Sequence, residues 1–176
     1  MIQTELDGIG LTEMMATFFD SQIAGRRPNE VIERHGSAYI ERWMLARKAT
    51  VPTFVGRGYV TRNVDDPTPI PSFMENLYLH RYCRGDAEDL HCHPWPNVTL
   101  VVRGWFVEHT PAGQFTRMPG DLVFRAAEER HAIIDVRPDT LTLFATGIKE
   151  REWGFWPNGE FIHHREYSAW KQAQLS

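Results

Sequence analysis

The chain has 176 residues, a formal net charge of −4 and a pI near 6.1, and its Lys and Arg residues are scattered rather than clustered. This length suits one domain that buries roughly 70% of its unfolded surface, and the charge excludes the basic footprint typical of nucleic-acid binding. The first residues, MIQTELDGIG, lack the positively charged region and the apolar region of a signal peptide, and no apolar run approaches the ~20 residues that span a bilayer. We therefore expect a cytoplasmic protein with no nucleic-acid partner and no membrane contact.

Residues 1–50 are predicted to form a helical extension. Apolar residues recur at the spacing of one helix face, and Gly25 ends this run; they are Leu11, Met14, Met15, Phe18 and Phe19. A second helix is expected to open at Pro28 and Asn29, to be interrupted at Gly36, and to end near Lys48. Its apolar stripe comprises Tyr39, Ile40, Trp43 and Met44. We expect both faces to cover a barrel or a partner subunit.

Residues 51–75 are rich in proline, glycine and aspartate, and include the run DPTPIP at 66–71. Proline has no amide hydrogen and interrupts both helices and strand ladders. The segment is therefore predicted to be a connecting loop or a lid.

From residue 76 the pattern changes to short β-rich runs that are separated by turn signals. Strands are predicted at 76–83, 97–103, 105–110, 121–125, 131–136, 140–146 and 151–156. These runs indicate an all-β barrel over 76–160, best described as a double-stranded β-helix of the jelly-roll type with α-helices at its amino end. Residues 161–176 are expected to be a tail with a short helix near 166–174. Apolar strands at 97–103 and 140–146 favour burial on both faces, which the partner of a homodimer would supply.

Two histidines two residues apart, His91 and His93, are the strongest chemical signal in the sequence. In an extended segment such residues point to the same face and lie close enough to share one ion. His131 follows at a distance that lets a third imidazole return across a barrel. Three neutral imidazoles bind transition metals and leave coordination positions open, as in reactive rather than structural sites. We predict a metal centre at these three histidines.

The surrounding residues resemble the motifs of the cupin superfamily. Its first motif, G-x5-H-x-H-x3,4-E-x6-G, is matched by Gly85, His91, His93 and Gly104, with Asn97 in place of the glutamate. Its second motif, G-x5-P-x-G-x2-H-x3-N, is matched at Gly120 and His131 and departs from it at Ala126, Glu128 and Asp135. The resemblance covers residues 76–157, and the runs LHCHPW, RGWFVEH, PGDLVFR and REWGFW are similar to those of small bacterial and phage single-domain cupins. It implies a single cupin barrel at 76–160.

Asn97 is the informative departure from the cupin pattern. An amide supplies neither the negative charge nor the strong oxygen donor of a glutamate, so the centre should be more positive and should favour an anionic or chelating substrate. Asn97 is expected either to join the metal ligands or to hydrogen-bond a ligand water. A three-histidine set is similar to that of the thiol dioxygenases, and this resemblance implies Fe(II). The choice of ligands alone also admits Zn, Mn or Ni.

Further catalytic candidates come from strand alternation. Arg103 shares a face with Asn97 if no bulge intervenes, which makes it a candidate anion clamp, and Arg81, Arg125 and Arg151 compete for that role. Tyr78 and His80 lie on the strand before the first motif and could supply a hydrogen bond or an acid/base group. Glu152 is a candidate acidic ligand or general base.

Three functions remain open on the sequence alone. The leading hypothesis is a mononuclear non-haem Fe(II) dioxygenase that acts on a small anionic or chelating substrate. The second is a redox-neutral Zn, Mn or Ni enzyme, such as an isomerase, lyase or hydrolase, that uses the metal as a Lewis acid. The third is a binding module that holds a small molecule with the help of the metal and does not convert it.

Overall fold

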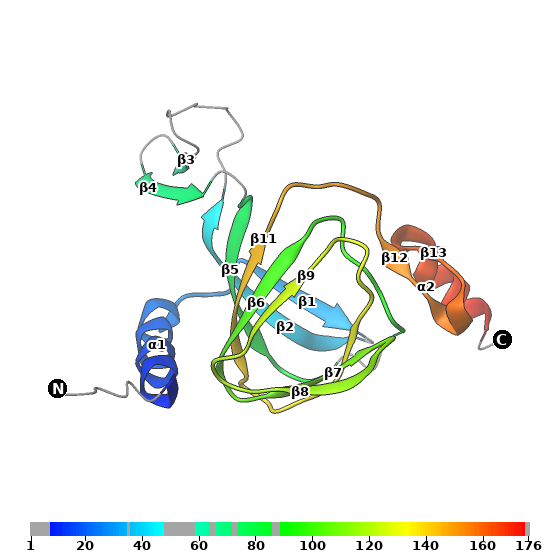
Figure 1. Cartoon of the computed structure of the whole chain (residues 1–176), viewed down its shortest axis with the longest axis horizontal. Helices are drawn as coiled ribbons and strands as arrows, with labels where there is room; N and C mark the ends of the chain where they lie inside the picture. The colour runs from blue at the N-terminus through cyan, green and yellow to red at the C-terminus, as the bar shows by residue number, and fades with distance from the viewer. Residues whose placement is uncertain are drawn as a thin grey trace.

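The structure is a computed structural model that describes residues 8–34, 36–47, 59–63, 66–71, 74–85 and 89–174. Figure 1 shows a β-barrel with α1 on one side and α2 on the other. The elements are α1 (Gly8–Ile23), β1 (Glu30–Arg34), β2 (Ser37–Arg47), β3 (Tyr59–Asn63), β4 (Asp66–Pro71), β5 (Asn76–Tyr82), β6 (Asn97–Arg103), β7 (Phe106–Thr110), β8 (Gly113–Arg117), β9 (Leu122–Arg125), β10 (Ala132–Val136), β11 (Leu141–Thr146), β12 (Gly154–Phe155), a 3-10 turn (Pro157–Gly159), β13 (Ile162–His163) and α2 (His164–Ala173).

Two antiparallel sheets enclose the barrel interior. The larger sheet has the strand order β1-β2-β5-β11-β6-β9, and the smaller has the order β10-β7-β8. Side chains of both sheets meet in one buried cluster, which comprises Tyr39, Ile40, Tyr82 and Val101 from the larger sheet and Phe106, Ile133 and Val136 from the smaller. This packing confirms the predicted all-β architecture.

The predicted first helix is present, and it covers the outer face of the larger sheet. Its buried contacts with the sheet come from Ala16, Ile23, Met15 and Phe19, which pack with Trp43, Leu79, Val102 and Leu141. Leu11, Met14 and Phe18 are instead exposed. The buried stripe is thus displaced around the helix from the predicted one. None of the helices that the structure describes is long and apolar enough to cross a bilayer.

The prediction of a second helix from Pro28 to about Lys48 is wrong, because this segment forms the hairpin of β1 and β2. Gly36 lies between the two strands with a φ of 72°, a conformation that glycine adopts without strain. Pairing with β1 on one side and β5 on the other outweighs the helical spacing of the apolar residues in β2. A register shift between Met44 and Ala46 also disturbs the alternation that identifies a strand. The barrel therefore begins at Glu30 rather than at residue 76.

The predicted loop at 51–75 is only partly described: 51–58, 64–65 and 72–73 lie outside the described residues. Within it, β3 and β4 form a two-stranded ladder, so the expectation that DPTPIP prevents pairing is wrong. Prolines at alternate positions place their missing N–H groups on one edge, and the other edge remains able to pair.

The predicted strands from residue 76 to residue 146 agree closely with β5, β6, β7, β9, β10 and β11, and the predicted terminal helix corresponds to α2. The strand predicted at 151–156 is reduced to the two residues of β12. Strand β8 was not predicted, because its residues GQFTR are polar and mostly exposed. Gly104 allows the tight turn between β6 and β7: its φ is 78°, and an added Cβ would lie 2.2 Å from Oγ1 of Thr140.

Candidate metal centre

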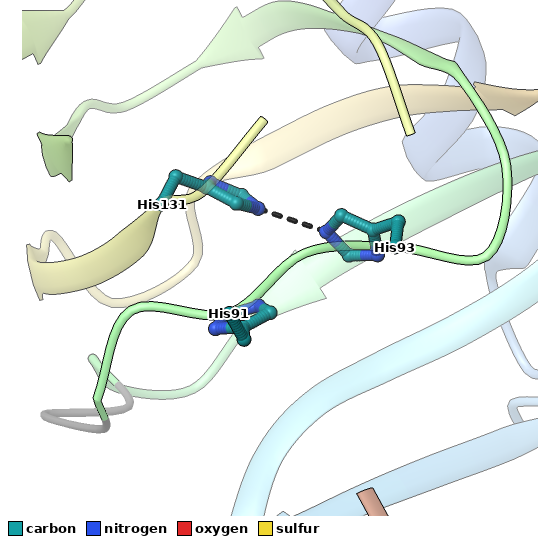
Figure 2. Close-up of side chains that lie close together, drawn as sticks. All are labelled: His91, His93 and His131. Atoms are coloured by element: carbon teal, nitrogen blue, oxygen red, sulfur yellow. Dashed lines mark hydrogen bonds between the residues drawn. The ribbon is translucent and has the colours of Figure 1, made fainter. Parts of the chain in front are cut away.

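The three predicted histidines converge inside the barrel. His91 and His131 form an isolated antiparallel bridge in which each backbone N–H donates to the other residue's carbonyl at 2.9 Å. His93 is held by donation from its N–H to the carbonyl of Ala127 at 3.2 Å. One ring nitrogen from each histidine lies within 4.8 Å of the others, and Figure 2 shows the three rings gathered together. Cys92 is fully buried between the two histidines and is a free thiol.

The protonation pattern of these rings fits a metal ion. Nε2 of His93 lies 2.8 Å from Nε2 of His131 (Figure 2). On the far side of the second ring, Nδ1 of His131 lies 2.9 Å from Oε1 of Glu108, although not in line for an ideal hydrogen bond. A carboxylate accepts only, so Glu108 favours the proton of His131 on Nδ1 and leaves its Nε2 lone pair directed at His93. A divalent ion would satisfy such converging lone pairs.

Glu108 is the centre of a buried ionic network. Its side chain is 1% exposed, accepts from Nε of Arg125 at 2.7 Å, and accepts from Nε of Arg117 at 3.0 Å. Arg125 also donates to Oγ1 of Thr99 at 3.1 Å. Burial raises the pKa of Glu108, but His131 and Arg125 outweigh it and lower that pKa to about 2. The carboxylate is therefore ionised at neutral pH.

Two of the three histidines, His131 and His93, are held neutral. Burial lowers the pKa of His131 to about 3, against the opposing effect of Glu108. Burial and the neighbouring rings of His131 and His91 also hold the pKa of His93 well below its usual range. Neutral imidazole is the form that binds metal ions, so burial prepares these side chains as ligands.

The histidines line a cavity of roughly 310 Å³ that also contains a second polar group. Nε of Arg42 donates to Nε2 of His80 at 2.9 Å, and Nη1 of Arg42 donates to Glu30 at 2.9 Å. Because arginine only donates, this bond fixes the proton of neutral His80 on Nδ1. Burial, followed by Arg42, holds the pKa of His80 well below its usual range. His80 stacks on Phe144 with ring centroids 4.9 Å apart.

Arg103, the predicted anion clamp, lies elsewhere. Its guanidinium pairs with Asp20 of α1 and donates to the carbonyl of Asp139. The pairing of β6 with β11 shifts register between Leu141 and Thr142, so that both Val101 and Val102 are buried and Arg103 points away from the interior. Arg103 was expected to share a face with Asn97 only in the absence of a bulge, and this bulge moves it to the other face.

The other predicted residues are distributed around the centre. Glu152 is not beside the three histidines: its side chain is 57% exposed and interacts with Lys149 and His163. Tyr78 stacks on His80 and lies under the guanidinium of Arg42, 4.7 Å from its ring centroid. Asn97 is 3% exposed and borders a different cavity, beside Pro96 and Phe124. Its role as a ligand stays a prediction.

Sequence reasoning missed Glu108, Arg42 and Glu30. Glu108 could have been found, because it lies two residues after Phe106 on a predicted strand and thus on the same inward face. Arg42 and Glu30 were hidden by the mistaken helix. Arg125, one of the competing arginines, borders the histidine cavity.

Comparison with known proteins supports the fold. No protein-family model matches the chain, and no curated protein matches it in sequence. The structure of the DMSP lyase DddQ from Ruegeria pomeroyi DSS-3 superposes with a TM-score of 0.53 and 17% identity, over 87% of this chain and 78% of that chain. The polyketide cyclase RemF from Streptomyces resistomycificus superposes with a TM-score of 0.50 and 14% identity, over 80% and 85%.

A third similar structure is a cupin 2 conserved barrel domain protein from Rhodopseudomonas palustris, with a TM-score of 0.44 and 15% identity over 71% of this chain and 72% of that chain. The chain has the cupin fold, as its motifs predicted, with a three-histidine cluster that could hold a metal ion.

Proposed function

We propose that the protein is a metal-dependent enzyme that carries out a redox-neutral reaction, such as a lyase, isomerase or cyclisation reaction, on a small anionic or chelating substrate. The observation that carries this proposal is the placement of His91, His93 and His131 in one cavity with the Arg42–His80 pair. The three histidines would hold a divalent ion such as Fe, Zn, Mn or Ni. When bound, this ion would supply Lewis-acid polarisation of a substrate oxygen.

The charges around the cavity favour an anion. Three neutral histidines leave the charge of a divalent ion, about two units, uncompensated by its ligands. The glutamates do not change this balance, because Glu108 pairs with Arg125 and Glu30 pairs with Arg42. A carboxylate or another oxyanion would therefore gain from entering this cavity.

The Arg42–His80 pair would orient the substrate. His80 is neutral and carries its proton on Nδ1, for which the described part of the chain offers no acceptor. An oxygen of the substrate, reached directly or through a water molecule, would complete this hydrogen bond. His80 would then act as a hydrogen-bond donor or a general acid, while Arg42 fixes its tautomer.

The names of the two structures with a TM-score of at least 0.5 support a redox-neutral reaction, because one is a lyase and the other a cyclase. The second candidate is an Fe(II) dioxygenase, which the resemblance of the three-histidine set to the thiol dioxygenases favours. The two candidates differ in their use of O2.

The test combines anaerobic purification, reconstitution with Fe(II), Zn, Mn or Ni, and a panel of small carboxylates and thiols, with product analysis and O2 uptake. We expect metal-dependent conversion without O2 consumption, lost in His93→Ala and retained in the control His109→Ala, whose histidine does not line the cavity. Stoichiometric O2 uptake would instead establish the dioxygenase. Tight retention of an anion without conversion would indicate a binding module.

A further inference from the structure

A second group of metal-ligating side chains lies on the surface, just before β12, at the end of β13 and at the start of α2. Glu152, His163 and His164 each offer one ligand atom, and these atoms lie within 4.8 Å of one another. Oε2 of Glu152 is 3.3 Å from Nε2 of His163. The rings of His163 and His164 have centroids 4.4 Å apart. The three residues are thus already gathered in a geometry that requires only small side-chain movements to surround an ion.

The backbone and an aromatic neighbour hold this group in place. His163 pairs with Gly154 in the ladder of β12 and β13, and the N–H of His164 donates to the carbonyl of Trp153 at 3.2 Å. The ring of His164 stacks on Trp153 with centroids 4.6 Å apart and an angle of 6° between the planes. Two of the three ligands are therefore restrained before an ion arrives, which lowers the entropic cost of binding.

We propose that Glu152, His163 and His164 form a second site for a divalent transition metal ion such as Zn²⁺, Ni²⁺ or Co²⁺. Two imidazoles and one carboxylate are a donor set that these ions accept, with water completing the coordination. The proposal does not depend on the reaction assigned to the buried histidines. Trp153 borders the cavity of those histidines and stacks on His164, so an ion at the second site would brace one wall of that cavity.

Two existing contacts compete with binding of the ion, and the loss of each on binding can be measured. Lys149 pairs with Glu152 and competes for the carboxylate. Nδ1 of His163 accepts from the N–H of Arg165 at 3.3 Å, which places its ring proton on Nε2. An ion at Nε2 displaces that proton, the neutral ring then carries its proton on Nδ1, and the bond from Arg165 is lost. The contacts of the His163 ring with Glu152 and with the N–H of Arg165 are both long, so losing them costs little binding free energy.

The test measures Zn²⁺ stoichiometry and affinity by competition with a chromophoric chelator. His164→Ala, a surface change that leaves the buried cluster intact, is expected to bind one equivalent fewer than wild type, and Glu152→Gln to weaken that equivalent at least tenfold. The control His109→Ala is expected to match wild type. Lys149→Ala should tighten binding roughly two- to fivefold, as expected for removal of a surface ion pair.

A second readout is structural. On addition of Zn²⁺ the amide of Arg165 is expected to exchange faster with solvent in wild type but not in His164→Ala. Equal stoichiometry in wild type and His164→Ala, or an equivalent that survives unchanged in Glu152→Gln, would overturn the proposal. These outcomes concern only the surface group, so they are distinguishable from a failure at His91, His93 and His131.

Discussion

The buried histidine cluster and the surface histidine cluster reach a similar spacing of ligand atoms by different means. His91 and His93 lie two residues apart in one segment, His131 comes from a segment much later in the chain, and a backbone bridge between His91 and His131 joins the two segments inside the barrel. Glu152 lies two residues before β12, His163 ends β13 and His164 begins α2, so this cluster is local in the sequence. In the first cluster, burial lowers the pKa values of His93 and His131 and holds these two rings neutral. In the second, Lys149 and solvent compete with the ion.

The residues that contact the ligands from behind decide what each cluster can do. Glu108 lies behind His131 and is anchored by two arginines. In the surface cluster, the ion pair of Glu152 with Lys149 is exposed and therefore weak. The buried cluster should hold its ion tightly and respond to changes in its supporting network, whereas the surface cluster should bind weakly and contribute little to stability.

Stability should fall most strongly in Glu108→Ala. Removing this side chain leaves the buried guanidinium of Arg125 without its carboxylate, and breaking a buried ion pair costs about 3–5 kcal/mol. Urea denaturation of the metal-free protein measures this loss. A loss below about 1 kcal/mol would show that the network does not support the barrel.

Acid should destabilise the metal-free protein in two stages. The folded pKa of His131 is about 3 and its unfolded value is 6.5, so the unfolded state binds more protons between these values and stability falls as pH drops below 6.5. The folded pKa of Glu108 is about 2 against 4.5 when unfolded, so its contribution, on the order of 3 kcal/mol, is present above pH 4.5 and is lost toward pH 2. Urea midpoints measured from pH 7 to pH 3 test this, and a constant midpoint would contradict it.

Glu108→Gln separates support of the metal ligand from support of the fold. The amide keeps the shape but loses the charge that holds the proton of His131 on Nδ1, so metal affinity should fall about 10- to 100-fold. Competition with a chelator measures the change. The matched control is Glu152→Gln, which should leave the metal affinity of the buried cluster unchanged. Equal affinity of the buried cluster in both variants would show that Glu108 does not support metal binding.

The smallest effect is expected for Glu152→Gln on the stability of the metal-free protein. Its ion pair with Lys149 is exposed on both sides, and such pairs contribute about 0–1 kcal/mol. The urea midpoint should therefore stay close to that of wild type. A destabilisation like that of Glu108→Ala would mean that the hairpin depends on this carboxylate as strongly as the barrel depends on Glu108.

Much of the barrel was predictable because its strands alternate and end at turn residues. The predicted strand 97–103 coincides with β6, and the spacing of His91, His93 and His131 predicted their convergence. The hairpin of β1 and β2 was not predictable from periodicity, because its apolar spacing also fits a helix and only pairing with β5 decides between the two. The expected homodimer stays a prediction.

The rest of the site depends on contacts between distant residues. One bulge near Val102 turned Arg103 out of the barrel, and local alternation does not report where such an extra residue falls. Arg42 reaches His80 only because β2 lies beside β5. Glu108 meets His131 only because β7 pairs with β10.

His91, His93 and His131 are proposed to hold one transition metal ion. The most direct test is elemental analysis of protein purified without added chelator, in the His164→Ala background that removes the proposed surface ligand. We predict about one transition metal ion per chain in this variant and almost none after the further change His93→Ala, with circular dichroism showing an intact barrel. An unchanged metal content after His93→Ala would contradict the account.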